Sequence, residues 1–181
     1  MLSFLIDVVR GRGAADFGAY RSWYIICIRP SQEKKVHEGL VQRGIESFQP
    51  MVVETRQWSD RTKKVEVPLF PGYGFVHITA QERLRVLRQR GVVEFLAVDR
   101  HPAVVSDEEI RSLQLAVDSS AHLYSVDMPR GGEVTIVQEG PLEGIRGIVM
   151  RPGETTHLVI PIESMHKAVA VDVDAGILNE G

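Results

Sequence analysis

The sequence predicts an α+β protein of two modules, a ferredoxin-like βαββαβ sandwich followed by a small all-β barrel. Three observations lead to this prediction. Up to about residue 117, β-rich segments alternate with amphipathic helical segments. From residue 129, short β-rich segments alternate with Gly and Pro turns. The charge changes as well: residues 21–117 hold 15 Lys/Arg and 12 Asp/Glu, whereas residues 118–181 hold 4 and 10.

The first strand and the first helix open the sandwich. The segment "SWYIICIRP", residues 22–30, is rich in β-branched and aromatic residues, which favours a buried strand. Ser31 is a suitable N-cap for a helix through about Arg43, and Gly44 is a suitable stop. The next segment, "IESFQPMVVETRQW", predicts a second strand in which Pro50 favours an edge or a bulge.

Two more strands complete the predicted sheet. The polar and basic residues 59–68 indicate a hairpin tip, and residues 73–78 and 92–98 predict the third and fourth strands. The order of elements then matches the split βαβ arrangement. We expect the helices to cover one face of a four-stranded antiparallel sheet.

Two further helices begin with capping boxes, in which each side chain satisfies a free amide of the first turn. Thr79 and Glu82 have this spacing at the second helix, which Gly91 ends, and Ser106 and Glu109 have it at the third. The residues expected to face inward are Leu84 and Leu87 in the second helix and Ile110, Leu113 and Val117 in the third.

The domain boundaries follow from these elements. Residues 1–20 form an N-terminal extension, in which Asp7 interrupts a short apolar stretch and no convincing cleavage site follows. Residues 21–117 form the first domain. Residues 118–128 lack a sustained period and predict a linker, and residues 129–181 predict a barrel of about five short strands.

Composition and motifs favour a binding protein without catalysis, cofactor or metal. The glycine-rich segments lack the Gly-Lys-Ser/Thr of a phosphate loop, and no Ser lies in a nucleophile-elbow pattern. The six His residues are scattered, and none pairs at metal-ligand spacing. Cys27, the one cysteine, predicts a reduced, buried thiol, which fits the cytoplasm. No apolar run approaches transmembrane length, so no membrane partner is expected.

Four segments, in order, resemble the NusG/RfaH family of transcription elongation factors across about residues 22–175. These are "WYIICIRPSQEKKV", "PLFPGYGFV", "RGVVEFLAVDRHPAVVSDEEI" and "GEVTIVQEGPLEGIRGIV", the last with the Gly144 that the family's KOW loops carry. The resemblance makes 21–117 a NusG N-terminal (NGN) domain and 129–181 a KOW domain. A short hairpin insertion and a compact segment after "GYGFV" resemble the specialised paralogues RfaH and UpxY. The lead before Trp23 and the segment "ERLRVLRQ", which lacks the threonines of RfaH, depart from that pattern.

The resemblance implies a transcription elongation or antitermination factor. The NGN domain would bind the clamp helices of the largest subunit of bacterial RNA polymerase through a hydrophobic depression. The KOW domain would recruit a second partner, a ribosomal protein or Rho. The positions that match the polymerase-binding face are Trp23, Ile25, Phe70, Pro71, Tyr73, Phe75 and Phe95.

The aromatic residues of "LFPGYGFV" allow two interpretations. Tyr73 and Phe75 alternate, so they share one sheet face. They either pack under the helices, with Gly74 and Val76 outward, or form an exposed patch that marks a binding site. The resemblance favours the patch. A third hypothesis joins the two: the KOW domain covers the patch until polymerase arrives, as in RfaH.

The basic residues near the helices also have two interpretations. Arg29 and Arg90 match positions that contact DNA in the RfaH-like branch, and upstream or non-template DNA is the implied partner. The full predicted DNA-binding set is Arg29, Lys34, Lys35, Arg83, Arg88 and Arg90, with Arg83 and Arg90 expected on one helix face. The alternative is a solvated helix face. Solvation is also the expectation for Arg61, Lys63 and Lys64 at the hairpin tip.

In the C-terminal module, Gly140, Pro141 and Gly144 first serve turn geometry, and they also leave a loop that a partner can approach. An acidic module is a poor match for RNA phosphates, so a protein partner is favoured. The rival hypothesis for the whole chain is an RNA-binding or ribosome-associated KOW-domain protein.

Overall fold

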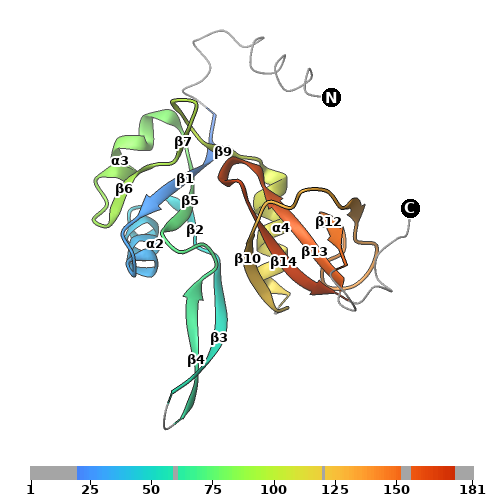
Figure 1. The fold of residues 1–181 in the computed structure, drawn as a ribbon. Helices are drawn as coiled ribbons and strands as arrows, with labels where there is room; N and C mark the ends of the chain where they lie inside the picture. The colour runs from blue at the N-terminus through green and yellow to red at the C-terminus, as the bar shows by residue number, and fades with distance from the viewer. Residues whose placement is uncertain (1–19, 59–60, 120, 152–155, 174–181) are drawn as a thin grey trace, which may run out of the picture.

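The computed structural model has an α+β fold, as predicted, and describes residues 20–58, 61–119, 121–151 and 156–173. The predicted extension falls almost wholly outside these residues. The first half of the chain forms an antiparallel sheet of order β2-β5-β1-β6, with a short β9 also paired to β1 (Figure 1). Its strands are β1 (Ser22–Ile28), β2 (Glu46–Phe48), β5 (Tyr73–Ile78), β6 (Val92–Phe95) and β9 (Val104–Val105).

One face of this sheet is covered by helices α2 (Glu33–Gln42) and α3 (Arg83–Leu87). Their core contains Val36 and Leu40 of α2 and Val86 of α3, together with Ile26 and Val76 of the sheet. Because neighbouring residues of a strand point to opposite faces, Phe75 must face away from these helices. The interpretation that places Tyr73 and Phe75 under the helices, with Val76 outward, is therefore wrong.

Helix α2 starts later than predicted. Ser31 is not its N-cap, because its φ of 63° places it in a tight turn after Pro30. The helix begins at Glu33, after Gln32, whose side chain makes no cap hydrogen bond. Gly44 follows the helix with φ of 72°, which agrees with the predicted stop.

The second helical segment is shorter than predicted, and a different set of its residues faces the sheet. The capping box is present, but the first turn is a 3-10 helix, η1 (Ala80–Glu82), followed by α3. A 3-10 turn has three residues instead of 3.6, so it shifts which residues face the sheet. Leu84 and Leu87 are 65% and 40% exposed, contrary to prediction, and Val86 is the buried residue.

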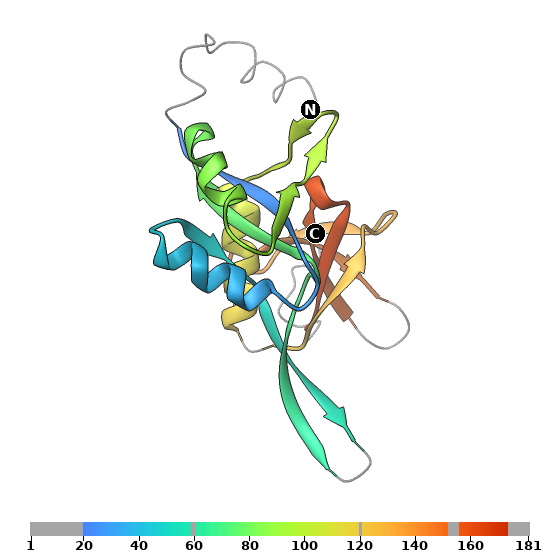
Figure 2. The ribbon, with the colours of Figure 1, turned by 90° about the vertical axis from the view of Figure 1, so that its left-hand side faces the viewer.

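A two-stranded hairpin projects from the first sheet (Figures 1 and 2). The predicted second strand breaks before Pro50 into β2 and β3 (Met51–Gln57), and β3 pairs with β4 (Thr62–Pro68). Most of the segment predicted as a tip is therefore strand. The hairpin consists of two seven-residue strands that pair along their whole length.

The chain then crosses to the second half. The predicted fourth strand ends at Phe95, and a small hairpin follows, β7 (Ala97–Val98) and β8 (His101–Pro102). Helix α4 (Asp107–Asp118) begins with the predicted capping box, in which the Ser106 hydroxyl accepts a hydrogen bond from the Glu109 amide at 3.2 Å. Its predicted stripe faces inward, as expected.

The second half is a five-stranded antiparallel sheet of order β10-β14-β13-β12-β11. The prediction of a linker through residue 128 is wrong for residues 123–127, which form an edge strand paired with β14. No pairing joins β10 to β11 within the described residues, so the sheet is open there. The elements are β10 (Leu123–Asp127), β11 (Glu133–Ile136), β12 (Arg146–Met150), β13 (Thr156–Ile162), η2 (Glu163–Met165) and β14 (Lys167–Val173).

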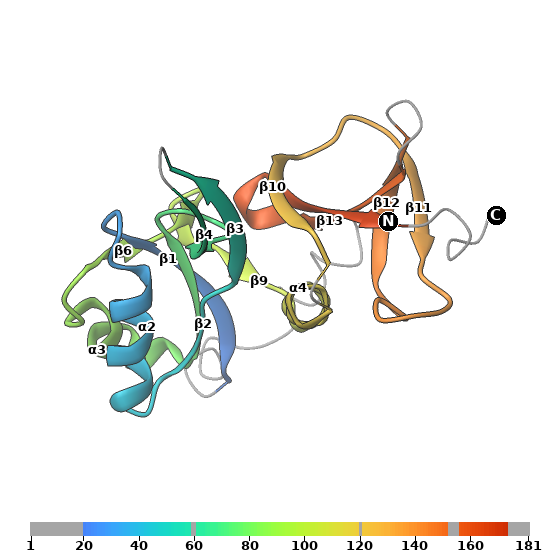
Figure 3. The same cartoon turned by 90° about the horizontal axis from the view of Figure 1, so that it is seen from below.

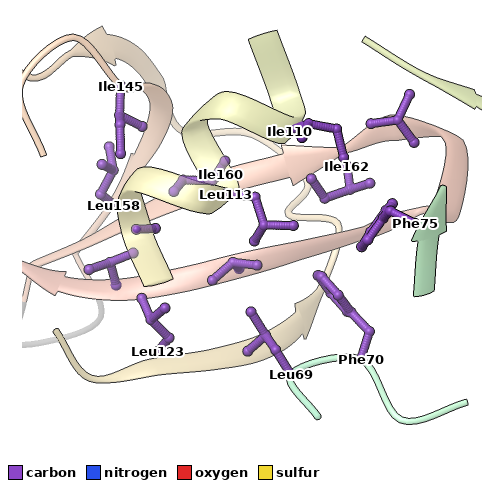
Figure 4. Close-up of a cluster of buried hydrophobic side chains, with 14 of the residues drawn as sticks. Leu69, Phe70, Phe75, Ile110, Leu113, Leu123, Ile145, Leu158, Ile160 and Ile162 are labelled. Atoms are coloured by element: carbon purple, nitrogen blue, oxygen red, sulfur yellow. The ribbon is translucent and has the colours of Figure 1, made fainter. Parts of the chain in front are cut away.

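The two halves share one hydrophobic core. Helix α4 lies between the two sheets (Figure 3). Its residues Ile110 and Leu113 pack in the same cluster as Phe75 of the first sheet and Ile160 and Ile162 of the second (Figure 4). The face of the first sheet opposite α2 and α3 is therefore buried inside the molecule.

Candidate interaction surfaces

The aromatic face is the group of predicted residues on the side of the first sheet away from α2 and α3. Ile25 and Phe75 are register partners on β1 and β5, which places them side by side. The Phe70 ring lies edge-on to Phe75, with centroids 6.2 Å apart, and Phe48 stacks from the other side at 6.1 Å. Trp23 completes the face one pair along, and its ring stacks on His77 at 4.9 Å. The structure thus places these side chains next to one another on one sheet face.

The loop before β5 is held by polar contacts that fix the aromatic face. The buried Glu33 carboxylate, 5% exposed, accepts a hydrogen bond from the Gly72 amide at 2.9 Å. The Ile28 amide donates to the Gly72 carbonyl at 2.7 Å. Gln49, also buried, donates its side-chain amide to the Tyr73 carbonyl at 3.0 Å. The loop is therefore anchored to both α2 and β1.

The aromatic face is not open to water in this arrangement. Phe70 and Phe75 are 1% and 0% exposed. Figure 4 shows Ile162 of β13 and Ile110 of α4 beside the Phe75 ring. Among the predicted face residues only Pro71 is exposed, and Tyr73 is half-buried. The prediction of an exposed patch is therefore wrong for this state of the molecule. In the structure, the second half of the chain covers the aromatic face.

Phe95 lies apart from the aromatic face. It is the register partner of Ile26, so it points to the side of the sheet that α2 and α3 cover. Its ring is edge-on to Tyr24, with centroids 6.0 Å apart, and the Arg83 guanidinium lies 5.2 Å from its centroid. Phe95 therefore belongs to the helix-side core.

A polar latch joins the two halves beside the shared core. The Glu109 carboxylate uses one oxygen for its capping box and the other to accept a hydrogen bond from the Glu163 amide of η2 at 3.0 Å. Next to it, the Ser164 hydroxyl donates to the Val104 carbonyl at 2.5 Å. We call these two contacts the latch. They were not predicted, because Glu109 already had a complete role as a capping residue in the sequence.

The predicted DNA-binding residues divide into two groups. The Arg29 amide donates to the Gly91 carbonyl at 2.9 Å, which places exposed Arg29 beside exposed Arg90. Lys35 and Arg88 are also exposed. These four residues lie in or next to the C-terminal ends of β1 and α3 and the first turn of α2.

The other two predicted DNA-binding residues have local partners. Lys34 pairs with Glu66 of the hairpin at 3.4 Å, an exposed ion pair. Arg83 is half-buried against Phe95, and its Nε has no hydrogen-bond partner. Because α3 ends at Leu87, Arg83 and Arg90 do not share a helix face, and that prediction is wrong.

The predicted KOW loop joins β11 to β12. Gly140 and Gly144 have φ of 90° and 83°, a conformation that favours glycine, and Pro141 is exposed. The Gly144 amide donates to the Val137 carbonyl at 2.9 Å, which closes the loop. Leu142 is buried below it, whereas Glu139, Pro141 and Glu143 are exposed, so the loop presents an ordered surface with two carboxylates.

Shifted titrations in the described residues have local causes. The Glu82 pKa is lowered, chiefly because its carboxylate accepts the Thr79 amide, with Arg21 and Arg85 contributing. Burial raises the pKa of the Cys27 thiol and lowers that of His37.

Within the described ranges, no group of three or more His, Cys, Asp or Glu side chains is placed to hold a metal ion. No helix in the same residues is long and apolar enough to cross a membrane.

Comparison with known proteins identifies the family. The family model described as "Transcription termination factor nusG" matches residues 21–114, more than half of the chain. The chain belongs to the NusG family. The match covers the first sheet and most of α4, so the aromatic face and the exposed basic group both lie in the part that defines NusG.

Individual relatives extend the likeness. "Transcription termination/antitermination protein NusG" of Rickettsia felis is 23% identical over 172 residues, which cover 85% of this chain and 87% of the relative. The Chlamydia trachomatis protein of the same name is 30% identical over 102 residues, 50% of this chain and 56% of the relative. The solved structure "Domain interaction in Thermotoga maritima NusG" covers 90% of this chain and 98% of its own, with 21% identity and a TM-score of 0.51, which supports the fold.

Proposed function

We propose that this chain is a NusG-like transcription termination/antitermination factor that binds bacterial RNA polymerase through the aromatic face. The observation that carries the proposal is the contiguous apolar group on β1, β5 and the loop between β4 and β5, on the sheet side that α2 and α3 leave free. Buried aromatic anchors commonly dominate protein interfaces. The clamp helices of the largest subunit are the proposed partner. Phe95 is left out of the surface because it faces the helix-side core.

The closed arrangement implies that binding requires opening. Phe75 has no exposed surface, so polymerase cannot reach it while β13 and α4 cover it. We propose that the KOW domain, which occupies the second sheet from residue 129, masks the NGN face and is displaced by polymerase. A binding site populated only in an open minority lowers the apparent affinity by that fraction.

The exposed basic group supports a contact with upstream or non-template DNA. Arg29, Lys35, Arg88 and Arg90 are exposed near the ends of β1, α2 and α3, and no ion pair within the described residues neutralises them. Phosphate recognition requires positive charge and reach, which exposed arginines supply. Neutralising Arg29, Arg88 and Arg90 together is expected to reduce DNA-dependent recruitment, measured with elongation complexes that carry or lack upstream DNA.

The second sheet is the proposed site for a further protein partner, a ribosomal protein or Rho. The order β2-β5-β1-β6 of the first sheet fits a ferredoxin-like NGN domain. The five-stranded topology of the second sheet fits the KOW assignment. The covered aromatic face is consistent with a specialised paralogue of the RfaH or UpxY kind, acting in the cytoplasm. Mapping the chromosomal sites that the factor occupies distinguishes a specialised factor, bound at one target operon, from a general factor bound at many genes.

A pull-down of bacterial core RNA polymerase by the full chain tests the proposal. Phe75→Asp is a poor variant, because a charge at this buried position also destabilises the fold. Tyr73→Ala removes a half-buried ring at the rim of the face, and Tyr124→Ala, half-buried on the other face of the second sheet, is the matched control. We expect the first variant to lose binding and the second to retain it. If both variants retained polymerase binding equally, the aromatic face would not be part of the polymerase interface.

A further inference from the structure

The β3–β4 hairpin presents a basic and aromatic tip that neither the fold nor the polymerase proposal uses. The hairpin projects from the body in two perpendicular views (Figures 1 and 2). Its outer described residues, 55–58 and 61–64, contain four basic side chains and no acidic one. All eight residues are exposed. With Asp60 counted, the sequence of residues 55–64 holds four basic side chains and one acidic one, so the tip has a net positive charge on a chain of net charge −3.

Trp58 is the feature that solvation does not explain. Its side chain is 52% exposed, whereas Trp23, the other tryptophan, is 6% exposed. The Arg61 guanidinium lies 5.8 Å from the Trp58 ring centroid, and the Trp58 amide donates to the Arg61 carbonyl at 2.8 Å. The Trp58 ring is thus large, exposed to water and in contact with a cation, and it lies near the end of a projecting hairpin. Such a ring is suited to stack against a planar partner.

The register divides the tip into two chemical faces. Arg56 and Lys63 are cross-strand partners, and Trp58 lies on the same face by alternation. Thr55 is paired with Lys64 on the opposite face, next to the pair formed by Gln57 and Thr62. One face thus offers an aromatic ring and cations, and the other offers hydroxyl and amide groups beside a further cation. Arg56 shares its charge with Glu54 at 3.1 Å, whereas Lys63 and Lys64 make no ion pair with a described residue.

We propose that the hairpin tip binds single-stranded RNA. A base stacks on Trp58, and Arg61, Lys63 and Lys64 contact the phosphates. Stacking on an exposed side chain requires an unpaired base, which excludes the interior of a duplex. On the opposite face, the hydroxyl and amide groups of Thr55, Gln57 and Thr62 are suited to the ribose 2′-hydroxyl of a neighbouring nucleotide, which distinguishes RNA from DNA. This site is separate from the proposed DNA surface and adds a second nucleic-acid contact to the proposed function.

The test uses the full chain and two fluorescein-labelled probes of about 12 nucleotides, oligouridine and its deoxy counterpart, in an anisotropy titration. The chain is expected to bind the RNA, and its tryptophan emission is expected to be quenched, since Trp58 is the exposed tryptophan. Trp58→Ala should weaken RNA binding roughly 5- to 100-fold. Lys63→Gln with Lys64→Gln should reduce the slope of log K against log salt by about 1.4, since each phosphate contact contributes about 0.7 for single strands.

Arg111→Gln with Arg130→Gln is the matched control, because it removes two exposed charges away from the hairpin. RNA affinity should stay unchanged in this variant. Three results would overturn the proposal: absence of RNA binding at low salt, equal affinity for the deoxy probe, or equal weakening by the control pair. A separate polymerase pull-down with Trp58→Ala should give wild-type binding, so failure at the tip and failure at the aromatic face are distinguishable.

Discussion

The latch gives a direct way to open the molecule. Glu109→Ala removes the acceptor of the Glu163 amide and also breaks the capping box of α4. Ser106→Ala breaks the same capping box but leaves the carboxylate that accepts the Glu163 amide. Each variant loses one of the two side-chain-to-backbone bonds of the capping box, so the difference between them reports mainly the contact between the halves.

The size of that difference follows from the geometry. A hydrogen bond to a charged acceptor contributes about 1.5–3 kcal/mol, and partial exposure of Glu109 favours a lower value, about 1 kcal/mol. The loss of half of the capping box costs about 1 kcal/mol in each variant, so these two costs largely cancel. A change of about 1 kcal/mol raises the open fraction about fivefold when the closed state dominates.

Two assays measure the open fraction in the full chain. The apparent Kd for core RNA polymerase should be about fivefold lower for Glu109→Ala than for Ser106→Ala. In a Trp58→Phe background, Trp23 reports the aromatic face, and its emission should shift to the red as the face is exposed. The same Kd and the same emission in both variants would show that the Glu163 contact does not hold the two halves together.

Three further predictions concern stability. Glu33→Ala should lower the free energy of unfolding by about 1–3 kcal/mol, because it leaves the partly buried Gly72 amide without an acceptor, whereas the exposed Glu38→Ala on the same helix should change it little; urea unfolding compares the two. Gly91→Ala should be more destabilising than Gly44→Ala, since both have positive φ but only at Gly91 would the new Cβ meet a buried side chain, at 2.6 Å; similar melting temperatures would contradict this. The lowered pKa of Glu82 means that its ionised form stabilises the folded state at pH values above the ordinary 4.5, and that this stabilisation is lost as the pH falls through the lower folded pKa. The stability difference between the wild type and Glu82→Gln should therefore shrink on acidification, and a constant difference down to acid unfolding would exclude the mechanism.

Local signals in the sequence predicted local structure well. The capping boxes at Thr79 and Ser106 mark the true starts of their helical segments, because a cap depends on residues three positions apart. The inward face of α3 was predicted incorrectly, since a 3-10 first turn leaves no signature that distinguishes it from an α-helical turn. Alternation correctly placed Tyr73 and Phe75 on a common face but could not say what lies against it.

Contacts between distant segments account for the rest. Residues 118–128 show no sustained period, yet residues 123–127 pair along their whole length with β14, 40 to 48 residues later. The cover over Phe75 comes from Ile110 and Ile162, and no local pattern links these positions. The basic residues of the hairpin tip were expected to be solvated, and only the three-dimensional structure placed them beside an exposed tryptophan.

The shared core also affects how the protein emerges from the ribosome. Helix α4 is complete at Asp118, whereas the last strand that covers the aromatic face ends at Val173. At about 5–20 residues per second, that interval takes roughly 3–11 s. For this time the nascent chain has a complete first sheet and α4 but lacks the part of the cover that the second sheet supplies. Every molecule therefore passes once through a partly covered form during synthesis, before the second sheet closes over it.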